Sequence, residues 1–181
     1  MTGFGPFQMR LNRLYNAGFL ICVGLFTTFA MAQSPVQSCS SDEHTQFDFW
    51  IGDWQVHGAN GKLAGHNLIQ KKHAGCVLHE QYTTPSGYSG ESFNIYEPGR
   101  KVWHQTWVDN TGTLLLLEGG MINGSMVLQG ETTDSKGVVT KHRISWTPYP
   151  DASVRQHWES KDSGGKWITV FDGKYTRKSA A

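Results

Sequence analysis

The sequence predicts an all-β protein built as a single antiparallel, up-and-down β-barrel of about ten strands. From Phe47 onward, aromatic and β-branched residues occur in short runs separated by Gly, Pro, Asp and Asn, and no long segment has a helical period. The even spacing and short links favour consecutive hairpins, and closing them into a barrel removes exposed strand edges. With 181 residues, of which 38% are hydrophobic and 17% charged, the chain suits one globular domain.

Ten runs bounded by turn-forming residues give the predicted strands in chain order. The first five are expected at residues 49–57, 65–72, 76–83, 89–96 and 102–109. The second five are expected at residues 113–121, 125–132, 138–147, 153–160 and 167–175. Links such as Asn123-Gly124 contain residues that tolerate a reversal of the backbone. We therefore assign residues 47–178 to one barrel domain.

The N-terminal 32 residues have the pattern of a secretory signal peptide. Arg10 and Arg13 precede an apolar run, and Ala30-Met31-Ala32 matches the small-residue cleavage site. The apolar run is short for a bilayer span, and polar Gln33 follows it at once. We expect a mature chain that begins at Gln33, a polar lead-in over residues 33–46, a periplasmic or secreted location and no integral membrane segment after cleavage. An uncleaved N-terminal anchor is the alternative.

The charge balance bears on nucleic-acid binding, and the cysteine content bears on the redox compartment of the protein. Residues 1–32 hold two basic residues and no acidic one, so 14 Lys and Arg face 15 Asp and Glu in the remainder. This balance excludes a basic nucleic-acid-binding surface. Cys39 and Cys76 would meet an oxidising compartment, which favours a disulfide between them over two free thiols. The sequence does not indicate an oligomeric state.

One hairpin places a set of aromatic and amide side chains on a common face. A four-residue loop at 98–101 would pair Glu97 with Val102. The side chains on one face would then pair as Tyr96 with Trp103, Asn94 with Gln105, and Ser92 with Trp107.

A second hairpin gives the same kind of face. A loop at 148–152 would pair Thr147 with Ser153, and the pairs along one face would be Trp146 with Val154, Ile144 with Gln156, and His142 with Trp158. The opposite face carries Arg143, Arg155 and His157, whose charges favour solvent. The aromatic face is therefore the predicted interior.

Large aromatic side chains with a few polar groups among them are typical of small-molecule sites. The predicted function is binding of a small, largely apolar ligand inside the barrel. The candidate ligand-binding residues are Glu80, Asn94, Tyr96, Trp103, Gln105, Trp107, His142, Trp146, Gln156 and Trp158. The alternative is a structural envelope protein in which the same side chains fill the core.

No catalytic residue is assigned, and the sequence favours binding over catalysis. An interior Glu80 would have its pKa raised by desolvation, and Glu80 or His142 would then suit proton transfer in an isomerase or cyclase. A hydrogen bond to backbone or indole is an equally good account of Glu80. The sequence contains no nucleophile elbow, no phosphate-binding loop and no metal-ligand spacing.

Several motifs resemble the bacterial lipocalin-like barrel families of unknown function. They are FDFWIGDWQV at 47–56, GCVLHE at 75–80, WHQTWVD at 103–109, HRISWTP at 142–148 and VRQHWE at 154–159. The resemblance covers nearly all of the mature chain; it implies a calycin-type barrel and says little about activity. A more distant likeness is to nitrobindin-type barrels, which hold haem through one histidine. Neither His142 nor His157 aligns with that ligand, so haem is implied by the likeness alone and no cofactor is assigned.

Overall fold

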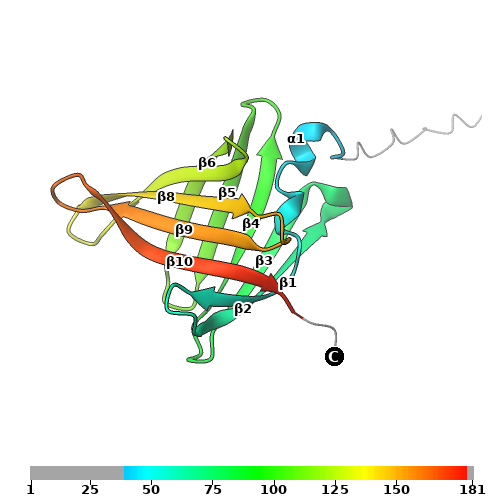
Figure 1. The fold of residues 1–181 in the computed structure, drawn as a ribbon. Helices are drawn as coiled ribbons and strands as arrows, with labels where there is room; N and C mark the ends of the chain where they lie inside the picture. Colours follow the sequence, from blue (N-terminus) through cyan, green and yellow to red (C-terminus); the bar gives the residue numbers. More distant parts are fainter. Residues whose placement is uncertain (1–38, 179–181) are drawn as a thin grey trace, which may run out of the picture. The chain divides into compact units, whose positions relative to one another are not determined.

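The protein folds as one closed antiparallel barrel, described here from a computed structural model over residues 39–178 (Figure 1). Each strand pairs with its neighbours in sequence, and β10 pairs with β1 to close the barrel. The strands are β1 Gly52–Gly58, β2 Leu63–Lys72, β3 Val77–Thr83, β4 Ser89–Glu97, β5 Val102–Asp109, β6 Leu114–Ile122, β7 Ser125–Thr133, β8 Val139–Pro148, β9 Val154–Lys161 and β10 Trp167–Arg177. The predicted ten-stranded, up-and-down architecture is confirmed.

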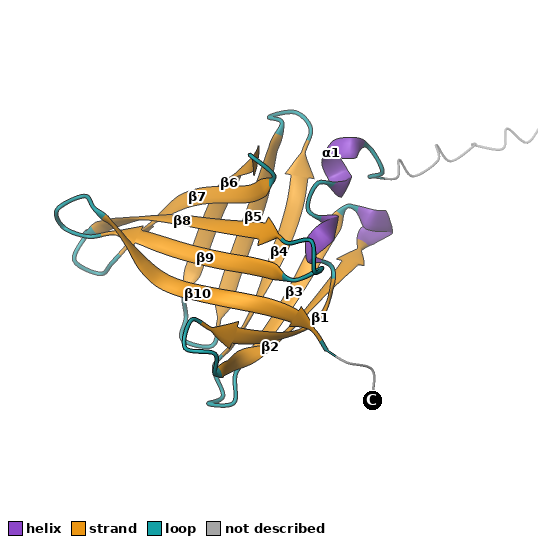
Figure 2. Cartoon of the chain, viewed as in Figure 1, coloured by secondary structure: helices purple, strands orange, loops and turns teal. Residues whose placement is uncertain are grey.

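Three short helical segments lie at the same end of the barrel (Figure 2). They are α1 Asp42–Thr45 and the 3-10 turns η1 Asp48–Trp50 and η2 His73–Gly75. The predicted signal peptide, the Gln33 start and residues 33–38 lie outside the described residues. No helix in the described part of the chain is long and apolar enough to cross a membrane.

The first predicted strand begins too early. Residues 48–50 form η1, in which the Trp50 backbone N–H donates to the Phe47 carbonyl at 3.1 Å, and β1 starts only at Gly52. Phe47 and Trp50 are both fully buried. An apolar residue every second or third position fits a strand and a buried tight turn equally well, so the pattern alone misplaced the boundary.

Phe47 and Trp50 close this end of the barrel with an aromatic cluster. The Phe47 ring stacks on Trp50 at a centroid distance of 4.9 Å and meets Trp103 at 5.6 Å and Trp146 at 5.2 Å. The Trp103 indole N–H donates to the Gln46 side chain at 3.3 Å. We call Phe47, Trp50, Trp103 and Trp146 the aromatic plug.

The pairing of β4 with β5 is as predicted, with Glu97 opposite Val102 and Asn94 opposite Gln105. The predicted pairing of β8 with β9 is wrong by two residues: Trp146 lies opposite Gln156, Ile144 opposite Trp158 and His142 opposite Ser160.

The cause of this shift is a turn that begins one residue later than predicted, so that Pro148 lies opposite Val154. The strand continues through Pro148, and the Ala152 N–H donates to the Tyr149 carbonyl at 3.0 Å, with Ala152 at a φ of 59°. A shift of two residues leaves every side chain on its predicted face, because side chains alternate with a period of two. Arg143 and Arg155 accordingly lie on the outer face, paired with Glu159 and Asp172 at 2.7 Å.

Cys39 and Cys76 form the predicted disulfide, with their Cα atoms 4.8 Å apart. Cys76 follows η2 and directly precedes β3, whereas Cys39 precedes α1. The bond therefore ties the segment that carries Phe47 and Trp50 to the barrel.

Replacing both cysteines, as Cys39→Ser with Cys76→Ser, should lower the free energy of unfolding by about 2–4 kcal/mol, because the crosslink restricts the unfolded chain. Urea unfolding followed by tryptophan fluorescence measures the change, and the reduced wild-type protein serves as the control. Equal stability of the oxidised protein and the double variant would show that the crosslink does not hold the plug in place.

Candidate ligand-binding site

A cavity of about 410 Å³ occupies the barrel interior, within the range of small-molecule sites. Thr84 and Tyr88, in the link between β3 and β4, line it, so it lies toward the end of the barrel opposite the aromatic plug. Its wall is largely aromatic and aliphatic, made by Ala64, Tyr82, Tyr88, Trp107, Leu115, Ile144, Trp158, Val170, Phe171 and Tyr175. Its polar lining comes from Glu80, Thr84, Gln105 and Gln156.

Two of the aromatic rings in the cavity wall pack directly against glycines of neighbouring strands. A Cβ atom on Gly90 would lie 2.2 Å from the Trp107 indole, and one on Gly65 would lie 2.7 Å from the Tyr82 ring. Both glycines are buried inside strands. A glycine inside a strand permits this close approach, so each fixes the position of a ring that lines the cavity.

Glu80, on β3, is the only carboxylate among the described residues that line the cavity, and only 4% of this residue's surface is exposed to solvent. Its Oε1 accepts a hydrogen bond from the Asn67 amide at 2.7 Å, and its Oε2 accepts one from the Ser92 hydroxyl at 2.6 Å. Both donors are neutral. The carboxyl is thus oriented by hydrogen bonds and not by an ion pair.

Further polar side chains extend this arrangement across the barrel. The Gln105 amide donates to Asn94 Oδ1 at 2.8 Å, and the Asn94 amide donates to Ser92 Oγ at 2.9 Å. On the other side, Asn67 donates to the Tyr175 hydroxyl at 3.2 Å, and that hydroxyl donates to Gln156 Oε1. We call the connected set Asn67, Glu80, Ser92, Asn94, Gln105, Gln156 and Tyr175 the polar floor.

Burial raises the pKa of Glu80 to about 7, and the hydrogen bonds from Ser92 and Asn67 offset only part of that effect. The neighbouring His79 side chain provides little compensation because it lies on the outer face, where it bonds Glu91 at 2.7 Å. Glu80 therefore changes charge near neutral pH, inside an apolar cavity.

A second carboxylate, Asp109, is hydrogen-bonded to two residues of the cavity wall. Asp109 Oδ2 accepts hydrogen bonds from the Tyr88 hydroxyl at 2.9 Å and the Trp107 indole N–H at 3.2 Å. Burial would raise the pKa of Asp109, but hydrogen bonds from Thr111 and Thr113 and from Tyr88 outweigh it and hold that pKa far below its usual range. Asp109 is thus a permanent negative charge, bonded to two rings that line the cavity.

The structure gathers half of the sequence-predicted site residues at the cavity. Glu80, Gln105, Trp107, Gln156 and Trp158 all line it. Asn94 is fully buried and does not line the cavity, but it is hydrogen-bonded to Gln105, which does.

The other predicted residues lie elsewhere in the interior. Trp103 and Trp146 belong to the aromatic plug, and the Tyr96 ring packs against His44 at 5.2 Å and Trp103 at 6.1 Å. His142 is buried, but it lies beside Trp158 and does not line the cavity.

Sequence reasoning missed several residues that shape the site, notably Asn67, Tyr82, Tyr88, Phe171 and Tyr175. Asn67 lies on the same face of β2 as the buried Gly65 and Ile69, at every second position, and this alternation can be read from the sequence. Tyr88 stands in a link between strands, where alternation gives no information about direction.

The histidine ligation of haem in nitrobindin-type barrels does not fit this cavity. Among the described residues, none that lines it is a histidine. His142 has both ring nitrogens occupied: Nδ1 accepts from the Trp158 indole at 3.2 Å, and Nε2 lies 2.8 Å from the Thr132 hydroxyl. Burial also lowers the pKa of His142.

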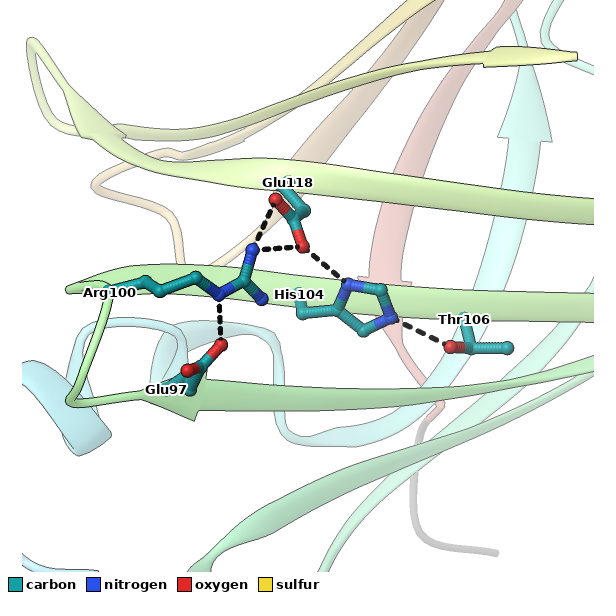
Figure 3. Close-up of polar contacts among 5 residues, drawn as sticks. All are labelled: Glu97, Arg100, His104, Thr106 and Glu118. Atoms are coloured by element: carbon teal, nitrogen blue, oxygen red, sulfur yellow. Dashed lines mark hydrogen bonds and ion pairs between the residues drawn. The ribbon is translucent and has the colours of Figure 1, made fainter.

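An ionic cluster on the outer face lies outside the cavity (Figure 3). Arg100, in the link between β4 and β5, donates to both Glu118 oxygens at 2.8 and 2.9 Å and also to Glu97. His104 bonds Glu118 at 3.1 Å and Thr106 at 2.9 Å. These groups satisfy one another at an exposed surface, where ion pairs contribute little stability. Within residues 39–178, no group of three or more His, Cys, Asp and Glu side chains is placed to hold a metal ion.

Comparison of the sequence with protein-family models and with the curated proteins finds no match.

Glu80→Gln should change how stability depends on pH. The pKa of Glu80 is raised in the folded state, so its contribution to stability is fully present below about pH 4.5 and is lost as the pH rises to about 7. Between about pH 5 and about pH 8, wild type should lose roughly 2–3 kcal/mol relative to Glu80→Gln. Urea unfolding across this range measures the difference, with the exposed Glu131→Gln as the control. Parallel curves for wild type and Glu80→Gln would contradict a buried, proton-binding carboxyl.

Proposed function

We propose that this chain is an exported, lipocalin-like barrel that binds a small, largely apolar molecule in the cavity above the polar floor. The observation that carries the proposal is the cavity itself, with aromatic rings around it and a few convergent polar groups at one end. Such a space counts against the alternative of a filled structural core. Export is supported by the Cys39–Cys76 disulfide, because such bonds persist in oxidising compartments.

An acid–base reaction inside the barrel is the second candidate, and the position of Glu80 favours it. A carboxyl with a pKa of about 7 suits proton transfer at neutral pH. His142, the other group considered for this role, is held by Trp158 and Thr132 outside the cavity lining. Glu80 would therefore act without a second acid–base residue, and binding remains the function that we propose.

Filling the cavity should abolish binding of a neutral apolar probe. Ala64 lines the cavity, whereas the adjacent Leu63 is exposed, so Ala64→Trp and Leu63→Trp form a matched pair. Prodan, a neutral naphthalene ketone whose emission shifts to the blue in apolar surroundings, reports entry. We expect Ala64→Trp to weaken prodan binding at least about tenfold, a loss of about 1.4 kcal/mol or more, and Leu63→Trp to leave it unchanged.

Circular dichroism melting should confirm that both variants fold. The proposal is wrong if folded Ala64→Trp binds prodan as tightly as Leu63→Trp does, or if wild type binds neither prodan nor any of the indole probes introduced below.

A further inference from the structure

The electrostatics of the cavity indicate the charge of its ligand. Glu80 accepts hydrogen bonds only from neutral donors, and among the described residues none that lines the cavity is Lys, Arg or His. Burying a carboxylate without a cation is costly, because neutral dipoles replace only part of its hydration. The free protein thus has an uncompensated acidic group that faces its own cavity.

The aromatic wall of the cavity also favours a positively charged ligand. Tyr82, Tyr88, Trp107, Trp158 and Phe171 present aromatic rings to the interior. The faces of such rings attract cations, and the attraction grows when water is excluded.

Two of these rings, Tyr88 and Trp107, also donate to the carboxylate of Asp109. That negative charge is therefore held against two of the rings that line the cavity, which favours a cation over an anion there.

We propose that the ligand is a protonated amine on an aromatic or otherwise apolar body, with the ammonium group bound by Glu80 at the polar floor. This inference rests on the proposed binding function and specifies the chemical class of the ligand. An ammonium at hydrogen-bond distance would neutralise Glu80 with a charge-assisted bond, while the apolar body occupies the aromatic wall. An anionic ligand would be repelled by Glu80 and Asp109, and a neutral one would leave Glu80 uncompensated.

Amine binding should depend on pH through Glu80. The ionisable groups nearest to Glu80 are the Tyr82 and Tyr175 hydroxyls within the barrel and His79 on the outer face. Burial raises the pKa of both tyrosines, so they stay neutral near pH 7. The pKa of Glu80 is about 7 in the free protein, and its ionised form binds the ammonium. Affinity should therefore fall about tenfold from about pH 8 to about pH 6.

Isothermal titration calorimetry of the full chain with three indole probes tests the inference. Tryptamine carries an ammonium, tryptophol a hydroxyl in its place, and indoleacetate a carboxylate. At about pH 8, tryptamine should bind at least about tenfold more tightly than tryptophol, and indoleacetate should bind most weakly. The comparison needs no variant, so it holds even if Glu80→Gln folds poorly.

Glu80→Gln should remove the preference for tryptamine over tryptophol, whereas the exposed Glu131→Gln should preserve it. The amine assignment is overturned if tryptamine and tryptophol bind equally, if indoleacetate binds most tightly, or if prodan binds and none of the indoles does. These results would leave the binding function standing. Failure of prodan and of all three indoles would reject the binding function and the amine assignment together.

Discussion

Closure of a ten-stranded barrel is the constraint on which the rest of the structure depends. Pairing of β10 with β1 leaves no open sheet edge, but it also encloses an interior wider than that of an eight-stranded barrel, whose side chains just fill it. The chain fills one end with the segment that precedes β1, which inserts Phe47 and Trp50 against Trp103 and Trp146. The remaining space is the cavity, so the plug and the site are two consequences of one closure.

The polar floor separates these two regions. Tyr175 contacts the rings of Trp50 and Trp54 and is joined by hydrogen bonds to Asn67 and Gln156. Glu80 lies in the same hydrogen-bond network. A buried carboxyl held only by neutral donors destabilises the fold at any pH at which it is ionised. A feature that opposes stability without aiding packing is typical of a functional site. A bound ammonium would offset this destabilisation, because the proposed ligand supplies the positive charge that the cavity lacks.

The sequence was sufficient for the fold because strand alternation and turn residues are local signals. The register of β4 with β5 followed from one four-residue loop, and even the misjudged turn at 149–153 kept the faces of β8 and β9 correct. The site was only half predictable. The alternation of side chains predicts that Trp103 and Trp107 point inward, but it does not predict which end of the barrel each occupies. The ring that packs on Trp103 is Phe47, which belongs to a segment that pairs with no strand. Tyr88 lies in a link, where alternation does not apply, and Tyr175, at the far end of the chain, lies beside β1 through barrel closure.

The most direct test of this account is the ionisation of Glu80 itself. Carbon-13 NMR of glutamate-labelled protein, with Glu80→Gln to assign the resonance, follows the Glu80 carboxyl carbon as the pH changes. The account predicts a midpoint near pH 7 in the ligand-free protein, set by burial without a cation. A midpoint near 4.5, the ordinary value for a solvated glutamate, would contradict it, because the carboxyl would then be hydrated or already neutralised and would have no need of an amine.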